Sequence, residues 1–326
     1  RGAELVSDAT RKLMADGRLP KPVISSACPA VVRLIRVRFP DLCDHVLNLN
    51  APMEVSAMMA KRAASERTGI PVEEIGAFFI TPCPAKVTDI KMPIGTEGSW
   101  CDGAIAISEV FPLLSHRMDK LETVEPIGQS GLIGVSWAGS GGESAALLNE
   151  KYLAADGIEN VIRVLEELED ERIRELDFVE LNACSGGCVG GVLCVENGYV
   201  AKARLQRLRK YLPVSQNHLD GGVPRDMEWT EPLEFAPVLK LSQNLEEAMQ
   251  MMEEIDVICE GLPGLDCGSC GAPSCRALAE DVVKGVARTS DCVFVMREQV
   301  KNVADTLSSI GGYVPSSLDS KEKQGN

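Results

Sequence analysis

The feature that most constrains this chain of 326 residues is the stretch 178–194, where a short apolar run leads into a glycine-rich loop. Cys184 and Cys188 lie four residues apart in this loop, among glycines at positions 186, 187, 190 and 191. Glycine lets the backbone approach a bulky inorganic group closely and leaves amides free to bind sulfur. The pattern favours two cysteines that both bind one metal cluster. The alternative is that both are buried thiols of the core.

Length and composition narrow the class of protein. A chain of 326 residues is long enough for about two domains of roughly 150 residues each. Hydrophobic residues make up 45% and aromatic residues only 4%, so aliphatic packing must dominate the core. The net charge of −15 argues against a general nucleic-acid binder, which needs basic patches.

The ends and apolar runs of the chain predict its location. No apolar run approaches the roughly 20 residues of a membrane span, and no signal-peptide pattern begins the chain. We therefore expect a cytoplasmic protein without a membrane span. Because the chain starts with Arg1-Gly-Ala-Glu-Leu5 instead of Met, we expect a fragment or a processed form.

Twelve cysteines are many for such a chain. In a small secreted protein they would indicate disulfides. Here the chain is long, carries no export signal, and sets its cysteines beside Gly and Pro. This usage favours metal or cluster ligation in a reducing compartment.

Short apolar runs alternate with helical segments, which predicts an α/β fold of parallel sheets flanked by helices. Cys28, Cys83 and Cys184 each follow the end of a predicted strand. Ligands of such sheets bind beyond the carboxyl ends of the strands, so we expect these turns to converge, with Cys188 as a fourth ligand. Four thiolates are what a cubane iron–sulfur cluster needs.

Periodicity and capping signals predict the individual elements. Helices are expected at 3–18, 30–39, 50–67, 143–155, 158–175 and 201–212, and strands near 22, 75, 103 and 177. The helix 201–212 is basic, with Lys202, Arg204, Arg207, Arg209 and Lys210. Residues 213–243, rich in Pro, Gly and Asp, are predicted to be a linker before a Met- and Glu-rich helix at 244–260.

A second cysteine group has the spacing C-x2-C-x4-C-x16-C and comprises Cys267, Cys270, Cys275 and Cys292. It predicts a metal centre in a small, mainly helical domain at 244–326. Zinc also accepts four thiolates, but the glycines next to the ligands favour a cubane, because they leave room and amides for its sulfides. The remaining cysteines are expected to be structural; they are Cys43, Cys101, Cys194 and Cys259.

Three segments carry a family resemblance. Ser25-Ser-Ala-Cys-Pro29, Thr81-Pro-Cys-Pro-Ala-Lys86 and Glu180-Leu-Asn-Ala-Cys-Ser-Gly-Gly-Cys-Val-Gly-Gly191 resemble, in order, the signature motifs of di-iron (FeFe-type) hydrogenases. The segment Cys267–Cys292 resembles the four-cysteine cluster domain of sensory-type members and of some electron-transfer and corrinoid proteins. The chain as a whole resembles the C-terminal part of a sensory or regulatory FeFe hydrogenase without the family's upstream segment.

The resemblance implies an H-cluster in domain 1–212, namely a 4Fe–4S cubane joined through one cysteine to a di-iron unit with CO and cyanide. It implies one additional 4Fe–4S cluster in the second domain. By motif, Cys28, Cys83, Cys184 and Cys188 hold the cubane, and Cys188 bridges to the di-iron unit. Lys86 is implied to donate a hydrogen bond to a cyanide, which suits a cation with three donors.

The implied activity is reversible H2 oxidation and proton reduction, with H2 and protons as substrates and a ferredoxin-like electron carrier. A role in sensing H2 or redox state would add a signalling or redox partner protein. Electrons are expected to leave through the Cys267–Cys292 cluster.

Three positions of the signature motifs depart from the family pattern. Ala27 replaces a cysteine that relays protons, and a methyl group cannot carry a proton. Thr81 and Asn182 replace methionines and are expected to tune the cluster through hydrogen bonds. The acidic pair expected upstream is not obvious, with Ser7 and Asp8 as the nearest candidates. Because proton transfer needs donors within hydrogen-bond reach, we expect slow turnover.

Two other hypotheses remain open. Hydrogenase-like homologues in cluster-assembly machinery keep the cysteine motifs but bind only cubanes, and Ala27 favours this non-catalytic alternative. Lys86 and the glycine loop 186–191 favour the hydrogenase. An interaction module whose acidic helices dock a kinase or another signalling partner is compatible with either.

Overall fold

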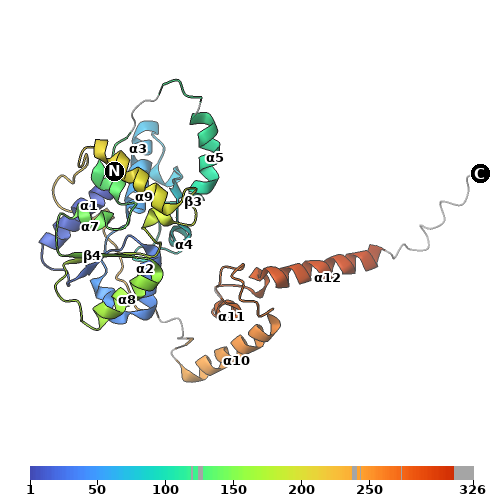
Figure 1. The fold of residues 1–326 in the computed structure, drawn as a ribbon. Helices are drawn as coiled ribbons and strands as arrows, with labels where there is room; N and C mark the ends of the chain where they lie inside the picture. Colours follow the sequence, from blue (N-terminus) through green and yellow to red (C-terminus); the bar gives the residue numbers. More distant parts are fainter. Residues whose placement is uncertain (119, 124–127, 237–240, 243, 273, 312–326) are drawn as a thin grey trace, which may run out of the picture. The chain divides into compact units, whose positions relative to one another are not determined.

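The computed structural model describes residues 1–118, 120–123, 128–236, 241–242, 244–272 and 274–311 (Figure 1). The chain divides into two compact units, Arg1–Pro237 and Val238–Asn326. Within the described ranges, no helix is long and apolar enough to cross a membrane.

The first unit has strands in two sheets with helices around them. The described strands are β1 Val23–Ile24, β2 Phe78–Thr81, β3 Gly103–Ala106, β4 Tyr152–Asp156 and β5 Phe178–Asn182. The α-helices are α1 Gly2–Ala15, α2 Pro29–Arg38, α3 Pro52–Thr68, α4 Pro84–Lys91, α5 Ile107–Met118, α6 Leu132–Ser136, α7 Gly142–Ala146, α8 Ile158–Glu169 and α9 Gly198–Leu208. Short 3-10 helices are η1 Pro40–His45, η2 Val72–Glu74, η3 Cys188–Gly190, η4 Arg209–Tyr211 and η5 Arg225–Met227.

Both sheets are parallel, which confirms the predicted α/β class. One has the strand order β1-β5-β4, and the other pairs β2 with β3. Phe178 of β5 is in register with Val23 on one side and Tyr152 on the other. β5 is therefore the central strand, and the cysteine loop follows the most protected strand of the fold.

The two faces of β5 are buried by different helices. Val179 and Leu181 pack with residues of α2 and α8, whereas Phe178 packs with residues of α1 and α3. Figure 1 shows α2 and α8 on one side of this sheet and α1 and α7 on the other. This alternation is the period of two that a strand covered on both faces must have.

Prolines define where the helices after β1 and β2 begin. Pro29 and Pro84 are the first residues of α2 and α4, so Cys28 and Cys83 become the N-cap residues. Proline suits this position because its φ angle is already helical and its missing N–H would have no partner there. The sequence thus fixes each cysteine at the junction of a strand and a helix.

The helix predicted at 143–155 is wrong beyond its first turn. α7 ends at Ala146, and Tyr152–Asp156 forms β4, paired in parallel with β5 over its whole length. Alanines at 154 and 155 favoured a helix locally, but pairing with a central strand overrides such a weak preference. The helix predicted at 158–175 also ends early, at Glu169.

The predicted linker at 213–243 is also corrected, because residues 213–236 pack onto the first unit. Met227 and Leu233 are buried in its core. The Glu4 carboxylate accepts a hydrogen bond from the Gln216 amide, and Asp8 accepts one from the Leu219 amide. Composition indicated an exposed tether, but α1 satisfies the backbone of this segment, so the first unit runs to Pro237 instead of ending at 212.

Replacing Met227 with alanine tests this correction. The side chain is only 2% exposed, and deleting a buried methionine side chain typically costs about 2–5 kcal/mol of unfolding free energy. Urea denaturation should show a loss of this size for Met227→Ala and almost none for Met92→Ala, whose side chain is 56% exposed. Equal stability of the two variants would show that residues 213–236 do not belong to the folded unit.

The second unit is small and mainly helical over its described residues, as predicted. It contains α10 Leu245–Gly261, α11 Cys275–Val283, η6 Thr289–Asp291 and α12 Val293–Gly311. Its core is built from Ile255 of α10, Leu278 and Ala279 of α11, and Cys292. So little apolar packing in a unit of this size is typical of domains that a metal helps to hold together.

Candidate metal centre

Three cysteines of the first unit lie at the carboxyl ends of parallel strands. Cys28 follows β1 and Cys184 follows β5, and these strands are neighbours in one sheet. Cys83 follows β2 of the other sheet. The site is therefore built between two sheets, which is a position where α/β proteins bind ligands.

Cys188, the first residue of η3, completes the group. Burial, together with Cys28, Cys83 and Cys184, raises the pKa of its thiol to about 11, although the Lys86 charge lowers it. Burial, followed by Cys83 and Cys28, also raises the pKa of Cys184. Cys28 and Cys83 thus lie close enough to Cys184 and Cys188 to raise the pKa of both thiols, and the assignment of all four as ligands of one centre stays a prediction. Metal binding would replace the protons that burial makes Cys184 and Cys188 retain.

Glycine is required where the cysteine loop touches its neighbours. Gly187 has a φ angle of 89°, and a Cβ atom there would collide with the Ser140 backbone nitrogen. A Cβ atom at Gly191 would collide with the carbonyl oxygen of Pro82, beside Cys83. The glycines predicted to accommodate a cluster therefore also let the loop pack tightly against the segments around it.

Lys86 brings a buried positive charge to the cysteines. It lies on α4, its side chain is buried, and its Nζ atom donates a hydrogen bond to the Ala27 carbonyl at 3.3 Å. No carboxylate among the described residues forms an ion pair with it. Asp89, one turn further along α4, is largely buried, and burial raises its pKa although Lys86 and Arg33 lower it. A buried ammonium needs a negative partner, and the nearby thiols can supply one.

The three departures from the family motifs lie close to the cysteines. The Ala27 amide donates a hydrogen bond to Ser25 Oγ at 3.1 Å. Thr81 is fully buried, and its hydroxyl accepts a hydrogen bond from the Cys83 amide at 3.1 Å. The side-chain amide of Asn182 donates a hydrogen bond to Glu180 Oε1 at 3.0 Å. Thr81 therefore contacts the backbone of Cys83 directly, whereas Asn182 is hydrogen-bonded to the buried Glu180.

A buried acid pair escaped the sequence analysis. Ser25 Oγ donates a 2.6 Å hydrogen bond to Glu143 Oε2, on α7. Glu180 of β5 accepts hydrogen bonds from the amides of Gly141 and Ser144. Burial and the negative charge of Glu180 raise the pKa of Glu143 to about 8. A carboxyl with such a pKa can take up and release a proton near neutral pH. A charged residue within the apolar run 178–181 was the available signal for Glu180.

The upstream candidates for proton transfer are engaged elsewhere. Ser7 donates to the Ala3 carbonyl at 2.9 Å and accepts a hydrogen bond from the Trp137 indole at 2.8 Å. Asp8 forms ion pairs with Arg11 and Lys12. These contacts stabilise α1 and its packing against Trp137.

The second cysteine group also comes together. All four members line one narrow cleft: Cys267, Cys270, Cys275 and Cys292. Cys275 is the first residue of α11, and its amide donates a 2.7 Å hydrogen bond to Asp266. Hydrogen bonds from Ser269 lower the pKa of the exposed Cys267 thiol, which favours the thiolate that binds metal.

The four cysteines predicted to be structural differ in their surroundings. Cys43 and Cys101 are buried in apolar clusters. Cys194 lines a cavity of about 220 Å³ together with Cys188, and its sulfur lies 3.8 Å from the Cys188 carbonyl oxygen. Cys259 packs beside Cys270 and Cys275. Cys194 and Cys259 thus each lie close to a cysteine of a predicted cluster site, although neither belongs to the cysteine motifs.

The donor sets define the class of protein. Within the described residues, no three His, Cys, Asp or Glu side chains gather closely enough to hold a single metal ion. In a cubane each cysteine binds its own iron, so its ligands stand wider apart than those of one ion. Two groups of four soft thiol donors, one beside a buried cation, are typical of an iron–sulfur protein.

Family comparisons identify this iron–sulfur protein further. Residues 3–152 and 143–192 match the family model of the iron only hydrogenase large subunit, C-terminal domain. Residues 262–294 match the model of an Fe-S cluster family. The chain belongs to the first of these families, that of the iron only hydrogenase large subunit, C-terminal domain, and is a hydrogenase-like iron–sulfur protein.

Two kinds of relative are similar in sequence. The NADP-reducing hydrogenase subunit HndD of Solidesulfovibrio fructosivorans is 22% identical over 237 residues, which are 58% of this chain and 40% of that protein. The cytosolic Fe-S cluster assembly factor nar1 of Aspergillus terreus is 30% identical over 99 residues, covering 30% of this chain and 16% of nar1. The chain thus spans less than half the length of either relative.

Solved structures of [FeFe]-hydrogenase HydA resemble the chain more distantly. A variant of HydA1 from Chlamydomonas reinhardtii is 16% identical with a TM-score of 0.47, covering 72% of this chain and 83% of the other. The HydA(deltaEFG) structure, described as showing stepwise H-cluster assembly, is 17% identical and has the same TM-score of 0.47.

Proposed function

We propose that this chain is the cluster-binding part of a slow FeFe hydrogenase of the sensory type, which interconverts H2 with protons and electrons. The observation that carries the proposal is Lys86, a buried cation that lies beside four cysteines and has no ion pair to a described carboxylate. A buried cation needs a negative partner, and an anionic ligand of a di-iron unit beside the cubane would supply one.

Each residue has a role in this proposal. Cys28, Cys83, Cys184 and Cys188 would hold the cubane, with Cys188 as the cysteine it would share with the di-iron unit. Lys86 would hold an anionic ligand of that unit by a charge-assisted hydrogen bond. The H-cluster, when bound, supplies the reversible splitting of H2. What supports this donor set is that Lys86 and the other three thiols all act electrostatically on Cys188.

Proton supply limits the rate. Ala27 carries only a methyl group, and its amide and carbonyl are engaged with Ser25 and Lys86. The Ala27 amide donates to Ser25, which in turn donates to Glu143, so the Ser25–Glu143 pair is a hydrogen-bonded proton carrier beside this position. A route that lacks a side-chain donor at position 27 needs water to complete it, which makes transfer slow.

Restoring a thiol at position 27 should therefore increase the rate. Ala27→Cys is expected to raise H2 production by the maturated protein by about 10²-fold, the lower range for a positioned acid–base group. Ala27→Ser is the matched control, because a hydroxyl of similar size releases a proton far less readily. Dye-coupled H2 assays measure both, and equal rates for wild type and Ala27→Cys would place the limiting step elsewhere.

The second unit suggests a route for the electrons and the kind of partner that receives them. We propose that a 4Fe–4S cluster held by Cys267, Cys270, Cys275 and Cys292 passes electrons to a ferredoxin-like carrier. The proposed location is the cytoplasm, and a redox or signalling protein is the proposed receiver of the sensory output.

A non-catalytic iron–sulfur protein that carries only cubanes is the second candidate. Ala27 and the similarity to nar1, a cluster assembly factor, favour it. Exposure of the maturated protein to H2 separates the two proposals. Bleaching of the cluster absorption by H2 alone supports the hydrogenase, and unchanged absorption with full cubane iron supports the alternative.

A further inference from the structure

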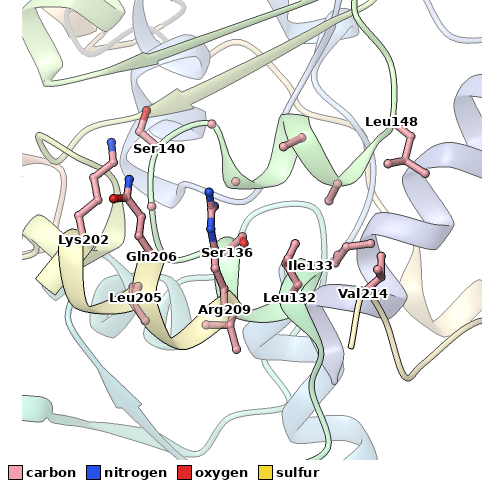
Figure 2. A pocket seen from close by; sticks show the side chains of 16 residues that line it. Leu132, Ile133, Ser136, Ser140, Leu148, Lys202, Leu205, Gln206, Arg209 and Val214 are labelled. Carbon is pink, nitrogen blue, oxygen red and sulfur yellow. The ribbon is translucent and has the colours of Figure 1, made fainter. Parts of the chain in front are cut away.

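A cavity of about 460 Å³ lies between α6, the turn Gly139–Gly142 and α9 (Figure 2). Its apolar surface comes from Leu132, Ile133, Leu205 and Val214. The volume lies within the range of small-molecule sites, roughly 300–1,000 Å³. None of the residues proposed to hold the clusters lines it, so neither cluster accounts for this cavity.

The polar side of the cavity is positively charged. Lys202, Gln206 and Arg209 extend from the basic helix segment toward the chain that carries Ser136 and Ser140 (Figure 2). Neither cation forms an ion pair or hydrogen bond within the described part of the chain, and no acidic residue lines the cavity.

The charge of this wall is unusual for the chain. With a net charge of −15, two cations without an acid beside them indicate a site for a negative ligand. An anion at the wall would give these groups the partners that the chain itself does not.

The cavity wall is bonded to the cysteine loop. The Ser140 amide donates to the Gly186 carbonyl at 3.0 Å, and the Val189 amide donates to the Ala138 carbonyl at 2.9 Å. Gly187 packs against the backbone of Gly139 and Ser140 so closely that a Cβ atom would not fit. A ligand that orders the 136–142 segment would therefore also order the loop that carries Cys184 and Cys188.

We propose that this cavity binds a small organic anion and that the bound anion rigidifies the cysteine loop. Lys202 and Arg209 bind the carboxylate or phosphate group, since ammonium and guanidinium groups both recognise such oxygens. The apolar body of the ligand packs on Leu132, Leu205 and Val214. The binding step does not rest on hydrogenase chemistry, so it can fail or succeed independently of the proposed function.

Calorimetric titration of the whole protein with defined probes tests binding. Octanoate and hexyl phosphate carry the two anionic groups on similar apolar chains, and 1-hexanol supplies the chain without a charge. Saturable binding of at least one anion, weaker at high salt, supports the site and identifies its preferred group. No saturable heat with either anion, or equally tight binding of 1-hexanol, would overturn the proposal.

Paired variants locate the binding. Lys202→Gln with Arg209→Gln should weaken anion binding by at least about tenfold, since two charge-assisted contacts are lost. Arg207→Gln with Lys210→Gln removes the same charge from α9 and η4 outside the cavity and should leave the affinity nearly unchanged. Equal losses in both pairs would mean that only the general field of the helix attracts the anion.

Amide hydrogen exchange tests the link to the cysteine loop. The bound anion should slow exchange in peptides that cover residues 184–190 of wild type, but not of the Lys202 and Arg209 variant. This readout needs no catalytic activity. Binding without slower exchange in this loop would disprove the coupling.

Discussion

Replacing Cys184 and Cys188 together with alanine is expected to remove about half of the iron from the protein. After reconstitution with iron and sulfide alone, two cubanes give about eight irons per chain, and the double variant should keep about four. Two of four thiolate ligands cannot hold a cubane between the sheets. The four remaining irons belong to the second unit, whose cysteines line their own cleft.

The matched control removes two other thiols of the same unit. Cys43 lies in the apolar core, and Cys194 lies beside Cys188 without being part of the predicted donor set. Cys43→Ala with Cys194→Ala should keep about eight irons. Iron and sulfide analysis measures both variants. Full iron in the Cys184 and Cys188 variant would refute the ligand assignment, and a loss in the control would make Cys194 a ligand.

Glu143→Gln is expected to remove much of the pH dependence of stability between about pH 5 and pH 8. Burial and Glu180 raise the pKa of Glu143 from its ordinary value of 4.5 to about 8. In this window the native state keeps a proton that the unfolded state has released, so stability falls as pH rises. The stabilisation that protonated Glu143 gives the native state is fully present below pH 4.5 and is lost as the pH rises through about 8.

The neutral glutamine avoids this loss and can still accept the hydrogen bond from Ser25. At about pH 8 the variant should be more stable than wild type by at least about 2 kcal/mol. Urea denaturation at several pH values measures the effect, and Glu159→Gln, an exposed change on α8, should follow wild type. Parallel pH profiles for Glu143→Gln and wild type would show that Glu143 titrates normally.

Local signals predicted the parts of the site that depend on short stretches of sequence. A strand, a cysteine and a proline in succession fix Cys28 and Cys83 at helix N-caps, because proline favours the first helical position. Gly69, with a φ angle of 73°, ends α3 where the sequence indicated. The compact spacing of Cys267 to Cys292 likewise predicted their common cleft.

The remaining features depend on contacts between distant segments. Ser25 and Glu143 are 118 residues apart, and nothing in either neighbourhood indicates that they meet. Tyr152–Asp156 becomes a strand only because β5 offers an unpaired edge. Residues 213–236 have the composition of a linker, but carboxylates of α1 bind their amides. Tertiary contacts decide such cases against local preference.

Infrared spectroscopy of the maturated protein tests the central claim most directly, since CO and cyanide bound to iron absorb where the protein does not. The account predicts bands from both ligands in the wild type. It also predicts that these bands disappear when Cys184 and Cys188 are replaced. A maturated protein that contains its full cubane iron but shows no such bands would contradict the H-cluster and leave a cubane-only iron–sulfur protein.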